Sequence, residues 1–231
     1  MKKIAIIPAR GSSKRIPKKN IKKFLGKPIM VYSIEAALQS NLFDEVMVST
    51  EDEVIANIAT KNGANVPFLR SEKNAGDMAS TYDVLEEVLL EYKKKNKKFD
   101  YTCCIYPTAP FVTIKKLKDS FDLLEKNKWD VVFPVVKFSY PIQRAILVND
   151  DSKMSMFDPQ MNVNRSQDLP ETFHDAGQFY WFNTNKLLES KKIWTEDTRV
   201  IKISELEAQD IDNMDDWILA ELKYKLLNKI N

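Results

Sequence analysis

The 231-residue chain contains only two cysteines and five glycines, and it has no long hydrophobic run. The cysteines are the neighbours Cys103 and Cys104, which excludes a disulfide scaffold and a metal knuckle and indicates reduced thiols in a buried strand. Apolar runs such as Ile4–Ala9 fall far short of the roughly 18 residues that a membrane helix needs. The first residues also lack the apolar stretch of a signal peptide, so we expect a cytoplasmic protein.

The charges are nearly balanced in number but unevenly placed along the chain. Overall there are 35 Lys and Arg against 33 Asp and Glu, and 44% of the residues are hydrophobic, which is typical of a globular protein and excludes disorder. Residues 1–27 hold ten basic residues and no acidic one, whereas the stretch between Lys202 and Lys223 holds seven acids and no base. This distribution predicts a site for a polyanion and, apart from it, a site for a cation.

Strand and helix signals alternate along most of the chain. Short apolar runs predict strands at 3–8, 45–50, 65–69, 100–106, 130–136 and 198–203, and amphipathic patterns predict helices at 28–40, 52–61, 80–92, 113–127 and 213–228. The alternation predicts one α/β domain over residues 1–231, with a doubly wound and mainly parallel sheet. From about 138 to 182, turn residues interrupt the rhythm and predict an inserted β-rich arm.

The strongest local signal follows the first predicted strand and reads Ile6-Ile7-Pro8-Ala9-Arg10-Gly11-Ser12-Ser13-Lys14-Arg15-Ile16-Pro17-Lys18-Lys19-Asn20. A turn with one glycine and two hydroxyl residues can direct backbone N–H groups at an anion, while basic side chains surround it. The segment lacks both the dinucleotide fingerprint and the P-loop pattern. It therefore predicts a triphosphate site of another kind, and a basic surface loop is the alternative.

Two acids in the C-terminal stretch are candidates for a metal site. Asp210 and Asp212 are two residues apart, which on an extended segment places both carboxylates on one face, where they can share a hard cation. The alternative is that Asp212 caps the following helix. Ser80 raises a similar question, because it stands at a helix N-cap, although this role is compatible with ligand binding.

The basic N-terminal segment resembles the signature of the CMP-sialic acid synthetase family, the cytidylyltransferases that activate nine-carbon ulosonic acids. The resemblance continues in the family's order in Val48–Asp52, Arg70 with Ala75–Thr81, Pro107–Pro110 and Asp210–Asp212, and so covers nearly the whole chain. Within the family, residues 165–170 and 173–177 look most like the branch that activates pseudaminic acid, a bis-acylamino relative of sialic acid.

The resemblance implies a Rossmann-like nucleotidyltransferase that transfers CMP from CTP to the anomeric hydroxyl of pseudaminic acid and releases pyrophosphate. It further implies Mg²⁺ as cofactor, CTP and an ulosonic acid as partners, no nucleic acid or membrane partner, and a homodimer assembled through the arm. The same reaction on sialic, legionaminic or another ulosonic acid is the alternative. A non-catalytic nucleotide or nucleic-acid binder is a more distant one.

The matching motif positions imply roles for individual residues. The implied CTP-binding residues are Arg10, Gly11, Ser13, Lys19, Asn20, Arg70, Asp77, Ser80 and Thr81. The implied catalytic residues are Arg10, Lys19, Asp210 and Asp212, the last two as metal ligands and Lys19 beside the α-phosphate. The sugar-binding candidates are Tyr106, Gln143, Arg144, Arg165, Gln167, His174 and Tyr180.

Two of the sugar-binding candidates depart from the sialic acid pattern. Tyr106 stands where sialic acid synthetases usually carry Gln, and His174 replaces a basic residue. Arg165 is suited to a bidentate grip on the substrate carboxylate. These departures favour a sugar that is substituted differently from sialic acid.

Overall fold

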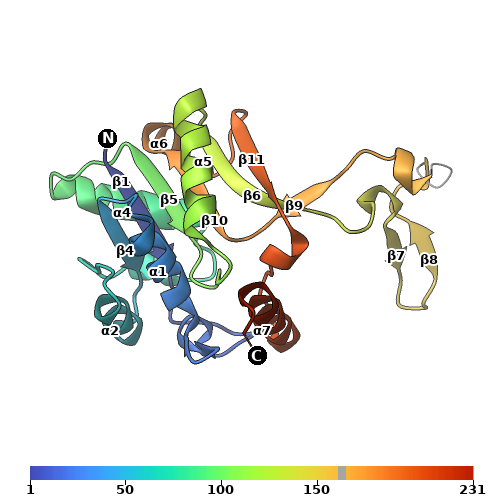
Figure 1. Ribbon diagram of the computed structural model, residues 1–231, viewed down its shortest axis with the longest axis horizontal. Helices are drawn as coiled ribbons and strands as arrows, with labels where there is room; N and C mark the ends of the chain where they lie inside the picture. The colour runs from blue at the N-terminus through green and yellow to red at the C-terminus, as the bar shows by residue number, and fades with distance from the viewer. Residues whose placement is uncertain (161–164, 231) are drawn as a thin grey trace.

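The computed structural model describes residues 1–160 and 165–230, with a seven-stranded sheet at its centre in the order β11-β6-β10-β5-β1-β4 and with β9 paired to β6 (Figure 1). The strands are β1 (Lys3–Pro8), β4 (Glu45–Ser49), β5 (Tyr101–Ile105), β6 (Val131–Lys137), β9 (Phe173–Asp175), β10 (Phe179–Asn183) and β11 (Thr198–Ile203). β1 runs parallel to β4 and β5, and β11 runs parallel to β6. β10 is antiparallel to β5 and β6, and β9 is antiparallel to β6. The sheet is therefore mixed but mainly parallel, as predicted.

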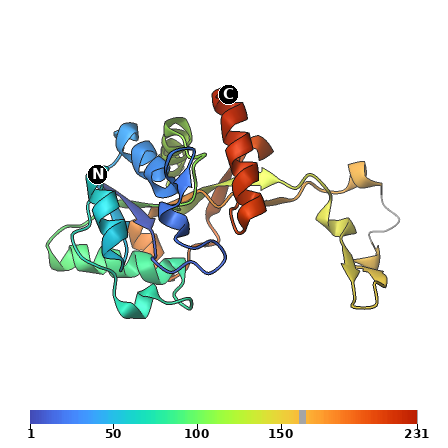
Figure 2. The ribbon, with the colours of Figure 1, turned by 90° about the horizontal axis from the view of Figure 1, so that it is seen from below.

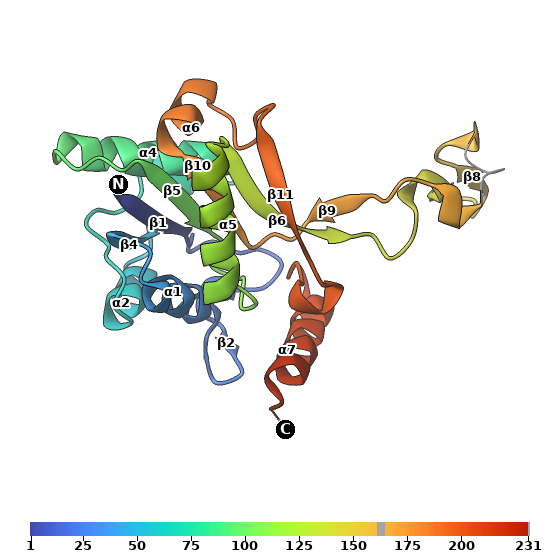
Figure 3. The same cartoon turned by 45° about the horizontal axis from the view of Figure 1, so that its top comes forward.

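Helices cover both faces of the sheet (Figure 3). They are α1 (Ile29–Ser40), α2 (Glu53–Lys61), α3 (Glu72–Ala75), α4 (Thr81–Lys94), α5 (Ile114–Asn127), α6 (Thr184–Ser190) and α7 (Met214–Asn228). Residues of α1, α2 and α5 pack in one buried cluster, and residues of α4 and α6 pack in a second. Cys103 joins the first cluster and Cys104 the second, because successive strand residues point to opposite faces. Both thiols are free and buried, and burial raises the pKa of each.

Several helices begin where the sequence predicted. Asp52, Ser80 and Thr113 cap α2, α4 and α5, and each side chain accepts a hydrogen bond from a backbone N–H of the first turn.

The strand predicted at 65–69 is wrong, because only Asn65 bridges β4, through its partner Met47. Pro67, two residues further on, has no N–H to donate, so the ladder does not continue.

The predicted arm leaves the body between β6 and β9 and carries η2 (Ile142–Arg144), the hairpin β7 (Ile146–Val148) with β8 (Met154–Met156), and η4 (Ser166–Asp168). It projects well away from the sheet (Figures 1 and 2). The predicted boundary at 182 needs correction, because β10 is a strand of the central sheet. Its residues Phe179–Phe182 form an unbroken buried run, which is what a strand covered on both faces requires.

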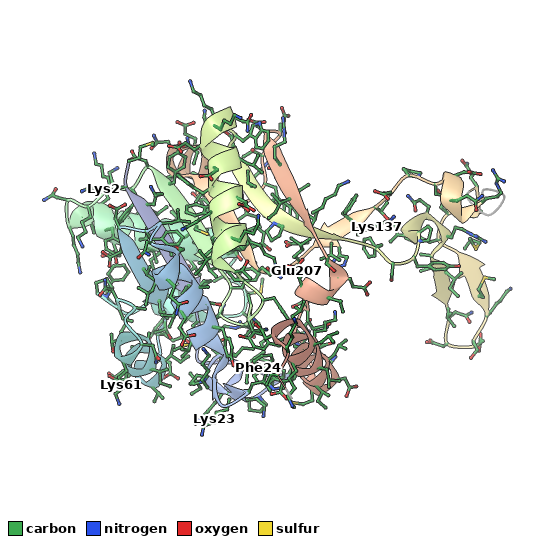
Figure 4. All side chains as sticks on the ribbon, viewed as in Figure 1. Lys2, Lys23, Phe24, Lys61, Lys137 and Glu207 are labelled. Carbon is green, nitrogen blue, oxygen red and sulfur yellow. The ribbon has the colours of Figure 1, made fainter. Side chains whose placement is uncertain are left out.

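A small hairpin fastens the C-terminal helix to the N-terminal segment. β2 (Lys23–Phe24) pairs with β3 (Lys27–Pro28) around Gly26, whose φ of 97° suits glycine. The Phe24 ring, which Figure 4 places beside α7, lies 5.6 Å from the Trp217 ring and 5.7 Å from the Tyr224 ring. These aromatic contacts bring the acidic C-terminal stretch next to the basic N-terminal loop.

Candidate active site

A cavity of about 670 Å³ opens where β1 and β5 end. Ligand sites of α/β sheets lie at such carboxyl ends. Three stretches of chain form its wall: the loop after β1, the segment around α3 with the start of α4, and the residues after β5. The lining residues are Pro8, Arg10, Ser12, Ser13, Lys14, Arg15, Lys19, Asn20, Arg70, Asn74, Gly76, Asp77, Ala79, Ser80, Thr81, Val84, Tyr106, Pro107 and Thr108.

The basic loop is folded back on itself by internal contacts. Asn20 is 7% exposed, and its side-chain amide donates a 2.8 Å hydrogen bond to the carbonyl of Arg10. Ile16 is fully buried at the middle of the loop, and its carbonyl accepts a hydrogen bond from the N–H of Lys19. The loop therefore presents Arg10 and Lys19 to one cavity although they are nine positions apart in sequence.

Gly11 has a different environment from the one expected of a phosphate-binding glycine. Its N–H donates a 2.7 Å hydrogen bond to Glu51 Oε1. A Cβ atom at this position would lie 2.7 Å from Asp52 Oδ2, so the close approach of the loop after β4 requires glycine. In this structure the Glu51 carboxylate takes the hydrogen bond of the Gly11 N–H, and Gly11 is not one of the residues that line the cavity.

Arg70 and the start of α4 form the far wall. Arg70 is 7% exposed, and its guanidinium donates to the hydroxyl of Ser49 at 3.0 Å and also to the carbonyl of Ser49. Burial lowers the pKa of Arg70, and nearby Glu51 partly opposes this shift, but an arginine stays protonated at neutral pH. Ser80 caps α4 in a capping box with Asp83, so Thr81 enters the cavity on the first helical turn.

Asp77 neutralises two of the loop's cations. Its carboxylate lies 2.7 Å from Arg10 Nη1 and 2.5 Å from Lys14 Nζ. Lys14, which hydrogen-bonds this carboxylate, and then Arg10 lower the pKa of Asp77. Asp77 therefore lines the predicted nucleotide cavity. There it neutralises Arg10 and Lys14, two cations that a bound triphosphate would need.

The acidic pair lies beside the basic loop rather than at an opposite pole of the molecule. Lys19 Nζ donates a 2.6 Å hydrogen bond to the carbonyl of Ile211 and lies 3.9 Å from Asp212 Oδ1. Arg15 Nη1 lies 2.7 Å from Asp212 Oδ2. Burial raises the pKa of Asp210, and the charge of Asp212 raises it further. The predicted triphosphate site and the predicted metal site are therefore neighbours, and Lys19 contacts both.

The helix-capping alternative for Asp212 does not hold. Asn213 is the N-cap of α7, and its side chain accepts hydrogen bonds from the N–H groups of Asp215 and Asp216. Asp210 and Asp212 are left as a pair of oxygen donors, and no group of three or more His, Cys, Asp or Glu lies together in the described part of the chain. Two carboxylates fit Mg²⁺, which commonly takes its other ligands from water and substrate phosphates.

Of the sugar-binding candidates, Tyr106 lines the cavity and Tyr180 packs behind it. The Tyr106 hydroxyl is 3.2 Å from Thr81 Oγ1, and its ring centroid is 5.3 Å from that of Tyr180. Tyr180 is 2% exposed and donates a hydrogen bond to Asp175 Oδ2. Tyr106 borders the cavity directly, whereas Tyr180 supports it from the sheet.

The other five candidates lie elsewhere. His174 is exposed on β9 and borders a smaller cavity of about 220 Å³ together with Asp210 and Lys223. Gln143 and Arg165 lie on the arm with local partners, the carbonyl of Pro170 at 3.0 Å and Asp168 at 2.7 Å. Arg144 and Gln167 are also on the arm. Within one chain, the structure does not bring these arm residues to the nucleotide cavity (Figure 1).

The structure adds residues that the sequence did not single out. Asn74 of α3 lines the cavity, and Glu51 supports the basic loop through Gly11. Asn74 stands in no pattern that marks it as functional, whereas Glu51 lies in the Val48–Asp52 block of the resemblance, where no role was assigned to it. The role of Glu51 comes from its contact with Gly11, which is distant in sequence. Thr108, within the Pro107–Pro110 motif, lines the cavity as well.

The fold and the cation-rich cavity at the end of β1 define a protein of the nucleotidyltransferase class. A solved structure of CMP:2-keto-3-deoxy-manno-octonic acid synthetase complexed with CTP shares this fold, with a TM-score of 0.71 over 99% of this chain and 100% of that one, at 17% identity. Among the described residues, no helix has the length and apolar character to cross a membrane.

The chain belongs to the cytidylyltransferase family, whose model matches residues 4–213, and it is therefore a CTP-dependent nucleotidyltransferase. It is 40% identical over 226 residues to the pseudaminic acid cytidylyltransferase of Campylobacter jejuni, covering 98% of this chain and 97% of the relative. It is 30% identical over 229 residues to the CMP-N,N'-diacetyllegionaminic acid synthase of Legionella pneumophila, covering 96% and 95%. The resemblance noted in the sequence is confirmed.

Proposed function

We propose that the protein transfers CMP from CTP to the anomeric hydroxyl of pseudaminic acid and releases pyrophosphate. The observation that carries the proposal is the single cavity that gathers the basic loop, Arg70, the start of α4 and Tyr106 in a chain of this family. Relatives from Campylobacter jejuni at 40% and 41% identity bear the name of this activity, and they are covered almost completely.

The reaction forms one bond and breaks another at the α-phosphorus of CTP. The anomeric oxygen attacks the phosphorus, the bond to the β-phosphate oxygen breaks, pyrophosphate leaves, and the hydroxyl proton is lost. Charge on the phosphoryl oxygens increases in the transition state, and positioned cations stabilise it. Lys19 and Arg10 are the cations we assign to this role. Burial lowers the pKa of Lys19 while the charges of Asp212 and Asp210 raise it, so the two acids help to keep it protonated.

Asp210 and Asp212 are the residues we assign to Mg²⁺. When bound, the ion would neutralise triphosphate charge and acidify the anomeric hydroxyl. The pair is suited to this task because burial makes the charge of Asp210 costly unless a cation lies nearby. Lys19 links the pair to the basic loop through the carbonyl of Ile211, so the metal and phosphate sites share one support.

For the sugar pocket we rely on Tyr106 and its neighbours. Pseudaminic acid has acylamino groups and a terminal methyl where sialic acid has a hydroxylated tail, so its pocket needs more apolar surface and fewer donors. The Tyr106 hydroxyl is already engaged with Thr81 and its ring packs against Tyr180, which presents aromatic surface to the cavity. Sialic acid should therefore be a poor substrate.

We also propose a homodimer in which the arm packs on a second copy and brings its polar residues toward that copy's sugar site. Val148 and Phe157 are 63% and 68% exposed on the arm, and a two-stranded hairpin is rarely stable without packing. The reaction would run in the cytoplasm, where the free thiols Cys103 and Cys104 stay reduced.

A pyrophosphate-release assay tests the proposal. The purified protein is incubated with Mg²⁺, each of the four nucleoside triphosphates, and a panel of pseudaminic, legionaminic and sialic acids. Release should occur with CTP, should require a sugar acid and should be fastest with pseudaminic acid. Comparable turnover with UTP, or equal rates with sialic acid, would overturn the nucleotide or the sugar assignment respectively.

A further inference from the structure

The segment that carries the acidic pair forms no strand and pairs with none in the described part of the chain. We call residues 205–212 the acidic strap. It begins with the single turn η5 (Glu205–Glu207) after β11 and continues as irregular chain to Asp212, just before Asn213 caps α7. Backbone carbonyls in such a segment need hydrogen-bond donors from elsewhere. The structure supplies them from side chains, which makes the position of the strap depend on a few residues outside it.

Lys223 of α7 makes the densest set of these contacts. Its Nζ atom donates to the carbonyl of Glu205 at 3.0 Å, to the carbonyl of Ala208 at 2.9 Å and to Gln209 Oε1 at 3.0 Å. One ammonium group therefore uses its three donors on residues 205–209, the five residues that precede Asp210. Lys223 and Asp210 also border the same small cavity, so the contacts of Lys223 with the strap lie next to this acid.

Two further side chains hold the turn of the strap from the sheet side. Gln178 is 2% exposed and donates a 2.6 Å hydrogen bond to the carbonyl of Glu207. Lys116 of α5 is 8% exposed and lies 3.1 Å from Glu207 Oε1. Figure 4 marks Glu207 near the base of the arm, where the strap leaves β11. These contacts fix the start of the strap, whereas Lys223 spans it up to Gln209.

We propose that Lys223 is a positioning residue that sets the place of the Asp210 carboxylate for the divalent metal. The inference rests on the proposed metal role of Asp210 and Asp212. Without Lys223, the carbonyls of Glu205 and Ala208 lose their charged donor, and the strap must move to find water or another partner. Partners behind a metal ligand typically change metal affinity by about 10- to 100-fold when removed.

Binding of Mn²⁺ to the protein with CTP, but without any sugar acid, tests the proposal without turnover. Free Mn²⁺ is followed by its electron paramagnetic resonance signal during a titration. Lys223→Met keeps the length of the side chain but removes its donors, and Lys223→Arg restores a charged donor. Lys225→Met, on the same helix two residues further, is the matched control.

We expect Lys223→Met to weaken Mn²⁺ binding about tenfold or more, Lys223→Arg to recover part of the loss, and Lys225→Met to bind as the unmodified protein does. CTP binding measured in EDTA should be unchanged in all three, which a general loss of structure would not allow. Unchanged Mn²⁺ binding in Lys223→Met, or a parallel loss of metal-free CTP binding, would overturn the inference.

Asp210→Asn separates this inference from the proposed function. If Asp210→Asn weakens Mn²⁺ binding and Lys223→Met does not, the positioning role is wrong while the metal site stands. If Asp210→Asn itself has no effect on Mn²⁺ binding, the metal assignment in the proposed function is wrong.

Discussion

The nucleotide cavity and the arm are built in opposite ways. The cavity is made of side chains with partners in the same chain: Asn20 holds the basic loop, Ser49 holds Arg70, and Asp77 pairs with Arg10. The arm instead exposes Tyr140 and Val148 by 67% and 63%. The nucleotide cavity is therefore organised by contacts within one chain, whereas the arm carries exposed apolar surface, which we propose packs on a second copy.

The largest expected effect comes from the acidic pair. Asp210→Asn and Asp212→Asn should each lower kcat/KM by about 10³, measured by pyrophosphate release over a range of Mg²⁺ concentrations. If either variant kept its activity with unchanged Mg²⁺ dependence, the pair would not belong to the site.

Asp210→Asn should not lose stability. The pKa of Asp210 is raised in the folded state, so the folded protein favours the protonated acid, and the ionised form at pH 7 opposes folding. Asp210→Asn removes this charge and should leave Tm at pH 7 unchanged or higher in metal-free buffer. A clear fall in Tm would indicate a structural role.

Substitution of the cations of the basic loop should give the next largest loss of activity. Lys19→Ala and Arg10→Ala should each lower kcat/KM by about 10², because loss of one donor aimed at transition-state charge costs about 3 kcal/mol. Lys98→Ala is the control, because Lys98 is an exposed lysine that follows the C-terminal end of α4 and does not line the cavity. Equal losses at Lys98 and Lys19 would mean that net charge, and not this loop, determines activity.

The arm prediction tests the other side of the comparison. Val148→Asp introduces a charge into the exposed apolar hairpin and should shift the protein from dimer to monomer in light scattering at micromolar concentration. CTP binding should stay within about twofold, because the cavity is complete in one chain. If the unmodified protein were already monomeric, or if Val148→Asp lost CTP binding, the proposed distinction between the nucleotide cavity and the arm would be wrong.

Tyr106 should alter the choice of sugar by a smaller factor. Tyr106→Gln should reduce kcat/KM for pseudaminic acid and narrow its ratio to that for sialic acid by about tenfold, which is within the range that an apolar pocket can discriminate. Thr81→Val is a useful companion, since it removes the hydroxyl that lies 3.2 Å from the Tyr106 hydroxyl, and its effect on the KM for CTP is measured beside the sugar ratio. An unchanged ratio in Tyr106→Gln would remove Tyr106 from the sugar pocket.

Asp77 should give the smallest effect. Its carboxylate competes with the triphosphate for Arg10 and Lys14, so Asp77→Asn should lower the KM for CTP by about two- to fivefold, as expected for exposed ion pairs. The advantage should fade at high salt, which screens both partners. A higher KM would show that Asp77 helps to hold the nucleotide.

Local sequence determined much of this protein. The alternation of apolar runs and amphipathic stretches predicted the α/β order, and caps such as Ser80 and Thr113 marked helix starts, because these signals act over a few residues. The basic loop was also evident, since its cations are neighbours in the chain. Most of the predicted nucleotide-binding residues do line one cavity.

Only the tertiary structure decided what lies next to what. The strand β10 reads like part of the arm, yet it enters the sheet between β5 and β6, and this depends on space left by distant strands. Lys19 and Ile211 are 192 residues apart in sequence, and their hydrogen bond forms where the N-terminal segment and the C-terminal segment pack together, as Phe24 and Trp217 also do. Lys223 of α7 meets the acidic strap because α7 packs back on it. Such contacts arise from packing of whole elements, to which no short sequence pattern is sensitive, and they unite the basic and acidic segments in one site.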